Sequence, residues 1–156
     1  MRTPRTGAMP EMSRHLVGLS TAIRLSMREG LLARGHELRP STAQVIPNLP
    51  DDGLRMGDLA ARLRLTLQRT GQLVAELEEV GYLTRVPDPD DGRARRVAFA
   101  PRGRALVRDI EEIHREIGAR FADALGHARF DAFCELLAEL DLAVNGADAP
   151  IRVLGA

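Results

Sequence analysis

The chain has 156 residues and is 44% hydrophobic, so it can bury the core of one domain. Its 22 basic and 22 acidic residues cancel, which argues against a protein that coats nucleic acid without specificity. One cysteine excludes a disulfide framework, and the lack of a membrane-length apolar run or signal-peptide segment indicates a soluble, cytoplasmic protein with no membrane partner.

Charge is distributed unevenly along the chain. Residues 55–108 carry 11 arginines and 7 acidic residues, whereas residues 109–156 carry 4 arginines and 10 acidic residues. A basic segment beside an acidic one directs one face toward phosphates and keeps the other face away from them.

The N-terminal half is predicted to contain two helices. The segment of residues 1–9 is short and polar, and it is expected to be disordered. A first helix should begin near Pro10 or Glu11 and end at Gly35, and it has apolar residues at helical spacing: Leu16, Leu19, Ile23, Met27, Gly30 and Leu31. A second helix is expected over residues 41–49, but Pro47 falls inside it, so it should be short or kinked.

Residues 56–80 have the pattern of a helix-turn-helix. A short amphipathic helix carries Met56, Leu59, Ala60 and Leu63. The apolar face of a longer second helix carries Leu67, Thr70, Leu73, Val74, Leu77 and Val80. The Thr66 hydroxyl is placed to cap the start of this helix, and Gly81 is suited to end it.

The opposite face of this second helix carries Gln68, Arg69 and Gln72 in its first turns. Long donors and acceptors of this kind suit base edges and phosphates in a major groove. Together with Thr66, they form the predicted recognition-helix part of a DNA-binding site. The alternative is a solvated helix face with no ligand.

Two short strands are predicted next, at residues 82–86 and 95–99, and they form a hairpin with a polar loop. The predicted DNA contacts of this wing are Arg85, Asp91, Arg93, Arg95 and Arg96. Arg93 would enter the minor groove while Arg95 or Arg96 meets the backbone, and Asp91 would bond its own turn or orient Arg93. The alternative is a set of edge charges that discourage aggregation.

The C-terminal third is predicted to form two more helices, over residues 101–125, ended by Gly126, and from about Ala128. Their apolar residues recur every three or four positions: Leu106, Ile110, Ile113, Ile117, Phe121 and Leu125, then Phe130, Phe133, Leu137, Leu140 and Val144. With the first helix, the chain has three long apolar stripes, which a winged helix alone cannot cover. A homodimer is therefore expected, with an intramolecular bundle as the alternative.

The segment from the second helix of the helix-turn-helix through the wing resembles the MarR (multiple antibiotic resistance regulator) family. The residues that carry the resemblance are Leu77, Glu78 and Gly81 at the helix end, Asp91 and Arg93 at the wing tip, and Gly103 after the wing. Arg55 departs from the pattern, because the family usually has a Ser or Thr cap there. The resemblance implies N- and C-terminal helices that interdigitate between two subunits.

The predicted fold is mainly α with a small β-hairpin wing: a winged helix-turn-helix plus N- and C-terminal dimerisation helices. Residues 37–104 would form the DNA-binding lobe, and residues 10–36 and 105–156 the dimerisation region of one intertwined domain. The predicted function is a sequence-specific DNA-binding transcriptional regulator, acting as a homodimer on a palindromic operator. The alternative is a winged-helix protein-interaction module without specific DNA binding.

The resemblance also implies a repressor that responds to a small-molecule effector. The effector would bind between the dimerisation helices and the lobe, at residues that the sequence leaves unknown. No cofactor, metal site or enzymatic activity is predicted, because the four histidines are scattered and no nucleophile lies near a base. Cys134 is expected to be a buried small hydrophobe rather than a redox switch.

Overall fold

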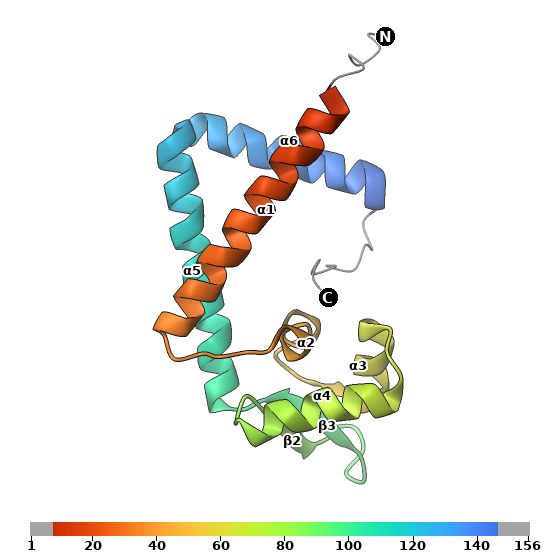
Figure 1. Ribbon diagram of the computed structural model, residues 1–156. Coiled ribbons are helices and arrows are strands. Elements are labelled where there is room, and N and C mark those ends of the chain that lie inside the picture. Colours follow the sequence, from red (N-terminus) through yellow and green to blue (C-terminus); the bar gives the residue numbers. More distant parts are fainter. Residues whose placement is uncertain (1–7, 147–156) are drawn as a thin grey trace.

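The computed structural model describes residues 8–146 (Figure 1). Its helices are α1 (Ala8–Ala33), α2 (Pro40–Ala43), α3 (Met56–Leu63), α4 (Leu67–Glu79), α5 (Pro101–Leu125) and α6 (His127–Asn145), with a 3-10 turn, η1, at Ile46–Asn48. The strands are β1 (Leu54–Arg55), β2 (Leu83–Pro87) and β3 (Arg95–Phe99). The predicted fold class, mainly α with a small wing, is confirmed.

The long helices and the short elements form two parts (Figure 1). Helices α1, α5 and α6 make an open frame, and the sheet with α2, α3 and α4 forms a lobe at the N-terminal end of α5. Helix α1 packs against α5, and α6 turns away from α5 at Gly126, whose φ of +90° is strained for any residue with a Cβ. The division at residues 36/37 and 104/105 stays a prediction.

The N-terminal half largely follows expectation. The predicted disorder of residues 1–9 lies mostly outside the described residues, and α1 begins at Ala8, slightly before the predicted start. Helix α2 ends at Ala43, and the chain continues into η1, which contains Pro47. Because proline lacks an N–H and clashes with the preceding turn, the second helix is short, as predicted.

The sheet has one strand that the sequence did not indicate. The strand order is β1-β3-β2, and all pairs are antiparallel. Leu83 pairs with Phe99 in the predicted hairpin, and Leu54 pairs with Val97 in the additional β1–β3 ladder. Two residues are too few to show alternation, so β1 has no pattern of its own and exists only because β3 lies beside it.

Helices α3 and α4 pack on this sheet and, with the start of α5, enclose one aliphatic core. Its fully buried side chains include Val45, Leu59, Leu73, Val74, Leu77, Tyr82 and Leu106. Two predicted members of the α4 apolar face are wrong, since Leu67 is 59% exposed and Val80 is 46% exposed. They stand at the two ends of α4, where the helix extends past the core.

Helix α6 contains no buried residue in the single chain. The expected burial of Cys134 is therefore wrong for the chain alone, in which this thiol is exposed. The reason is that, among the described elements, α6 packs mainly on α5, which leaves most of its circumference uncovered. Within residues 8–146, no helix has the length and apolarity that crossing a membrane requires.

Candidate nucleic-acid interface

The turn between α3 and α4 sets where α4, the predicted recognition helix, begins. Arg64 ends α3 in the left-handed conformation, with φ of +55°, and the N–H of Leu65 donates to the carbonyl of Ala60 at 3.1 Å. Thr66 then adopts an extended backbone, and its Oγ1 accepts from the backbone N–H of Arg69 at 3.2 Å. The predicted N-cap is confirmed, and it holds the first turn of α4 in a defined position.

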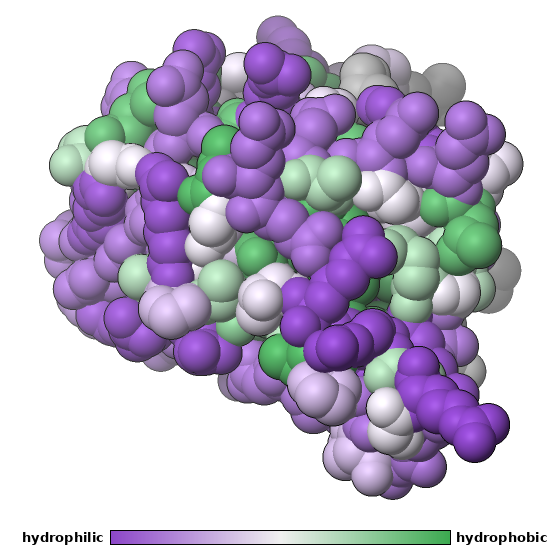
Figure 2. Space-filling view, turned by 90° about the horizontal axis from the view of Figure 1, so that it is seen from below, coloured by the Kyte–Doolittle hydropathy of each residue, from purple (hydrophilic) through white to green (hydrophobic). Residues whose placement is uncertain are grey.

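The outward face of this first turn is polar. Gln68, Arg69 and Gln72 are all on the solvent side of α4, while Thr70 and Leu73 on the other face are fully buried. Arg69 Nη1 donates to Gln72 Oε1 at 3.1 Å, so two of the predicted DNA-contacting side chains are already aligned with each other. Figure 2, which looks onto the molecule from below, shows a surface covered mostly by hydrophilic side chains.

The base of the wing is held by a buried carboxylate. Asp88 is 2% exposed, and its Oδ2 accepts from Arg55 Nε at 2.5 Å. Arg96 Nε lies 3.3 Å from the same oxygen, and Arg96 Nη2 donates to Asp90 at 3.2 Å. Arg55 is the last residue of β1 and directly precedes α3, so the cluster ties the wing to the helix-turn-helix.

The tip of the wing is a structured turn. The N–H of Ala94 donates to the carbonyl of Asp91 at 2.8 Å, and Asp91 Oδ1 accepts from the backbone N–H of Arg93 at 3.1 Å. The expectation that Asp91 bonds its own turn agrees with this geometry. The Arg93 side chain is exposed and, among the described residues, has no ion-pair partner.

The remaining wing arginines fall into two groups. Arg95 is exposed at the start of β3, with no acidic partner in the described part of the chain. Arg96 is engaged in the Asp88 cluster, and Arg85 donates from Nε to Glu78 at 3.2 Å, bracing the hairpin against α4. Within residues 8–146, the geometry therefore leaves Arg93 and Arg95 as the wing side chains free to meet a phosphate.

The charge environment of Asp88 shifts its acidity. The hydrogen bond from Arg55 is the largest cause, followed by the backbone N–H of Asp90, and these hold the pKa of Asp88 at about 2, below its ordinary 3.8. The same interaction with Asp88 raises the pKa of Arg55. Asp88 thus stays ionised in the folded protein well into acid.

This depressed pKa predicts an acid-dependent loss of stability. A carboxyl whose pKa is lowered by folding stabilises the folded state above its unfolded pKa, and this contribution disappears between about pH 4 and pH 2. We expect Asp88→Asn to be less stable at neutral pH, because Arg55 loses its buried charged partner, and to lose less stability than wild type across that window. Urea unfolding followed by circular dichroism at a series of pH values measures the difference.

Asp90→Asn is the matched control, because Asp90 also pairs with Arg96 but its side chain is 78% exposed. Its unfolding profile should follow the wild type closely. Parallel pH profiles for wild type and Asp88→Asn would contradict the assignment of the depressed pKa to Asp88.

Sequence reasoning missed Asp88 and Arg55 as site residues. Asp88 looked like one of several aspartates in a polar loop, and Arg55 looked like a departure from the capping pattern. The structure explains the second point: Arg55 occupies the N-cap of α3 without capping it, because a guanidinium has no acceptor for the backbone N–H groups, and it donates to Asp88. Only a pairing of an unexpected arginine with an acidic loop could have signalled the interaction.

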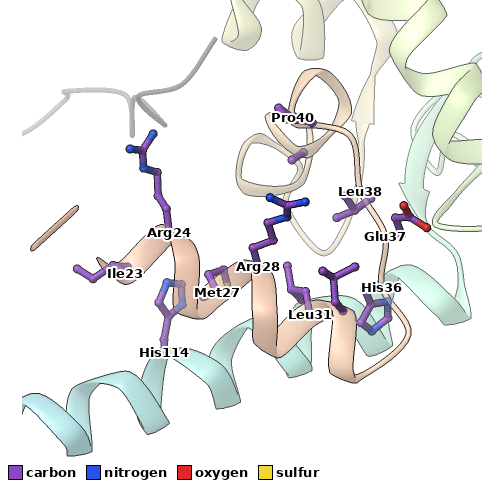
Figure 3. Close-up of a pocket in the computed structure, with 12 residues that line it drawn as sticks. Ile23, Arg24, Met27, Arg28, Leu31, His36, Glu37, Leu38, Pro40 and His114 are labelled. Carbon is purple, nitrogen blue, oxygen red and sulfur yellow. The ribbon is translucent and has the colours of Figure 1, made fainter. Parts of the chain in front are cut away.

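A cleft of about 580 Å³ separates the helical frame from the lobe (Figure 3). Its apolar lining includes Ile23, Met27, Leu31 and Leu32 of α1, together with Leu38, Pro40 and Ala43. Arg24, Met27 and Arg28 project from the same side of α1 in Figure 3, and His114 reaches the cleft from α5. Within residues 8–146, no three His, Cys, Asp or Glu side chains are grouped to hold a metal ion.

Comparison with known proteins agrees with this geometry. Residues 40–94, which span α2 to the wing tip, match the model of the MarR family. No curated protein matches the chain. Among solved structures, the chain is similar to the transcriptional regulator Tm0710 from Thermotoga maritima, with 24% identity and a TM-score of 0.63, over 86% of this chain and 94% of that one.

Two further structures share the fold. The YusO protein from Bacillus subtilis is 18% identical with a TM-score of 0.70, over 91% of this chain and all of its own. MepR of S. aureus bound to ethidium bromide is 18% identical with a TM-score of 0.65, over 85% of this chain and 95% of its own. A MepR mutant bound to an oligodeoxyribonucleotide aligns with a TM-score of 0.61.

The matched segment contains the recognition helix and most of the wing, and the fold extends through the long helices on either side. The helix end at Gly81, the wing tip at Asp91 and Arg93, and the position of Gly103 in the first turn of α5, after the wing, all lie where the resemblance predicted. Residues 40–94 of this chain are thus similar to the MarR family, and its winged-helix fold is shared along most of the chain with solved structures that include a transcriptional regulator.

Proposed function

We propose that this protein is a DNA-binding transcriptional regulator that acts as a homodimer on a palindromic operator, as a repressor that a small molecule releases. The observation that carries the proposal is the pairing of two exposed polar elements. One is the capped first turn of α4, with Gln68, Arg69 and Gln72, and the other is the wing, with Arg93 and Arg95 in solvent. A recognition helix reads base edges in the major groove, and an adjacent arginine-bearing wing suits phosphates or the minor groove.

The uncovered helical frame supports a homodimer. Apolar side chains of α1 and α6 are exposed in the single chain, among them Leu16, Leu19, Phe133, Leu137 and Leu140. Large apolar patches of this kind usually mark an interface. A two-fold dimer presents two recognition helices, which is the reason for proposing a palindromic operator.

The cleft between frame and lobe supports control by a ligand. Its volume of about 580 Å³ and its largely apolar lining suit a small organic molecule. The solved structure of MepR with ethidium bromide is that of a similar protein bound to such a molecule. A ligand in this cleft would contact both the helical frame and the segment that enters the lobe, so it could favour one arrangement of the two.

Single substitutions separate the two ways of contacting DNA. A site is first selected from a random pool of duplexes with the wild-type protein. We expect Gln68→Ala and Gln72→Ala to cost about 1–3 kcal/mol on this site, and to relax the preference at one base pair. Arg93→Ala and Arg95→Ala should weaken binding to most sequences alike, with a salt dependence flatter by about one ion for each phosphate that the arginine no longer neutralises.

The measurement is affinity for the selected and a scrambled duplex at several salt concentrations. Arg115→Ala is the matched control, because Arg115 is an exposed arginine on α5, outside the lobe, and should bind as wild type does. If both wing variants hold both duplexes as tightly as wild type, the proposed contacts of the wing with DNA are wrong. If the wild-type protein selects no duplex at all, the protein-interaction module describes the lobe better.

A further inference from the structure

His36 lies between the cleft and the segment that follows α4. It stands in the linker between α1 and α2, lines the cleft, and is only 6% exposed (Figure 3). Its Nδ1 is 3.1 Å from the hydroxyl of Tyr82, and its Nε2 is 2.8 Å from Asp109 Oδ2. One buried imidazole therefore touches the cleft, the segment after α4, and α5.

The chemistry of the partners assigns a direction to these two hydrogen bonds. An ionised carboxylate only accepts, so we assign the Nε2 proton of His36 to the bond with Asp109. In the neutral imidazole Nδ1 then accepts, and the Tyr82 hydroxyl donates to it. Both nitrogens of the ring are satisfied only while the ring keeps its present position between α5 and Tyr82.

Tyr82 is rigidly joined to the C-terminal end of α4. Its N–H donates to the carbonyl of Leu77 at 2.8 Å, and its carbonyl accepts from the N–H of Ala100 at 3.0 Å. Its ring is 1% exposed and lies under the guanidinium of Arg102, at 4.6 Å from the ring centroid. A displacement of the Tyr82 ring would therefore be transmitted to the backbone that ends the recognition helix.

Arg102 makes a second connection at the same place. Its Nη1 donates to the carbonyl of Val80 at 2.8 Å, and its Nη2 donates to the carbonyl of Gly35 at 3.2 Å. The end of α4 and the linker that carries His36 are thus held together by a small polar network. The His36 ring is the member of this network that also lines the cleft.

We propose that His36 is the positioning residue through which an occupant of the cleft changes the orientation of α4. This inference rests on the proposed function, because it explains how the ligand site and the DNA site would communicate. An occupant that presses on the cleft wall displaces the imidazole, and the bond to Tyr82 breaks. The end of α4 then moves relative to α5, which alters the spacing of the two recognition helices in a dimer.

The test fills the cleft without any ligand. Met27→Trp places a bulky ring in the cleft, and Met27→Leu is the size-matched control that leaves the cleft open. Tyr82→Phe removes only the hydroxyl that bonds His36 and keeps the ring under Arg102. The two changes are combined in a double-mutant cycle, and affinity for the selected duplex is measured for each full-length protein.

We expect Met27→Trp to weaken DNA binding by at least tenfold in the wild-type background and by less than threefold in the Tyr82→Phe background. If Tyr82 only stabilised the fold, Tyr82→Phe would lower the melting temperature, and the effects of Tyr82→Phe and Met27→Trp on DNA affinity would simply multiply. Circular dichroism melts show which variants fold, and Ile23→Phe, a milder filling of the same cleft, replaces Met27→Trp if that variant does not.

The outcomes distinguish the inference from the function on which it rests. Equal weakening in both backgrounds overturns the role of His36 and Tyr82 but leaves DNA binding intact. If the variants that fill the cleft bind DNA as tightly as Met27→Leu, the proposed coupling of the cleft to α4 is overturned. A wild-type protein that selects no duplex overturns both the inference and the proposed function.

Discussion

Replacing Gly103 by alanine is expected to destabilise the lobe severely. A Cβ at this position would lie 2.0 Å from the carbonyl oxygen of Tyr82 and 3.0 Å from Cδ1 of Phe99. The carbonyl cannot move aside easily, because it accepts from the N–H of Ala100 at 3.0 Å. The first turn of α5 would have to separate from the sheet, at a cost of roughly 3 kcal/mol or more, a large part of the stability of a typical domain.

The matched control is Gly118→Ala in the same helix. A Cβ on Gly118 would meet nothing within 4 Å in the single chain, so this change should stabilise α5 by about 0.5–1 kcal/mol. Urea unfolding and thermal melts of both variants measure the difference. If Gly103→Ala were as stable as the wild type, α5 would be able to shift away from the sheet at little cost in free energy.

Placing two charges on α6 is expected to break the proposed dimer. Leu137 and Leu140 are 42% and 49% exposed in the single chain, and they lie on one face of a helix that has no fully buried residue. Covering the exposed half of such side chains contributes roughly 1 kcal/mol each, and a buried unpaired carboxylate is strongly unfavourable. Leu137→Glu combined with Leu140→Glu should therefore weaken dimerisation by at least about 100-fold.

DNA affinity should fall with the dimer, because a single protomer can occupy only one half of a palindromic site. Light scattering over a range of concentrations gives the oligomeric state, and the selected duplex reports the affinity. Asn145→Glu introduces the same side chain at a polar position of α6 and should leave both unchanged. A double variant with the mass and affinity of the wild type would mean that the α6 face is not the interface.

Local signals were sufficient to predict most of the secondary structure. Thr66 marks the start of α4 and Gly81 marks its end. A hydroxyl cap and a residue free to take φ of +79° both act within one helical turn, so the sequence alone reveals them. The ends of α5 are predictable for the same kind of reason, because Pro101 suits the first turn of a helix and Gly126 suits a helix end. The apolar spacing between such signals identifies the buried face of a helix wherever the helix lies over the core.

Interactions between distant residues were not predictable, because nothing local records them. Arg55 and Asp88 are 33 positions apart, and His36 and Tyr82 are 46 apart, so neither pair forms a pattern that a window of sequence contains. The exposure of Leu67, Val80 and Cys134 depends on where each helix ends relative to its neighbours.

The sequence by itself therefore determined the helices, the hairpin and the polar face of the recognition helix, since these depend on capping, turn residues and periodicity within a few turns. Only the tertiary structure decided which charges are free. It placed Arg96 beside the buried Asp88 and left Arg93 and Arg95 in solvent. The physical reason is that ion pairing and burial depend on which elements the fold brings together, and β1, α3 and the wing meet only when the sheet forms.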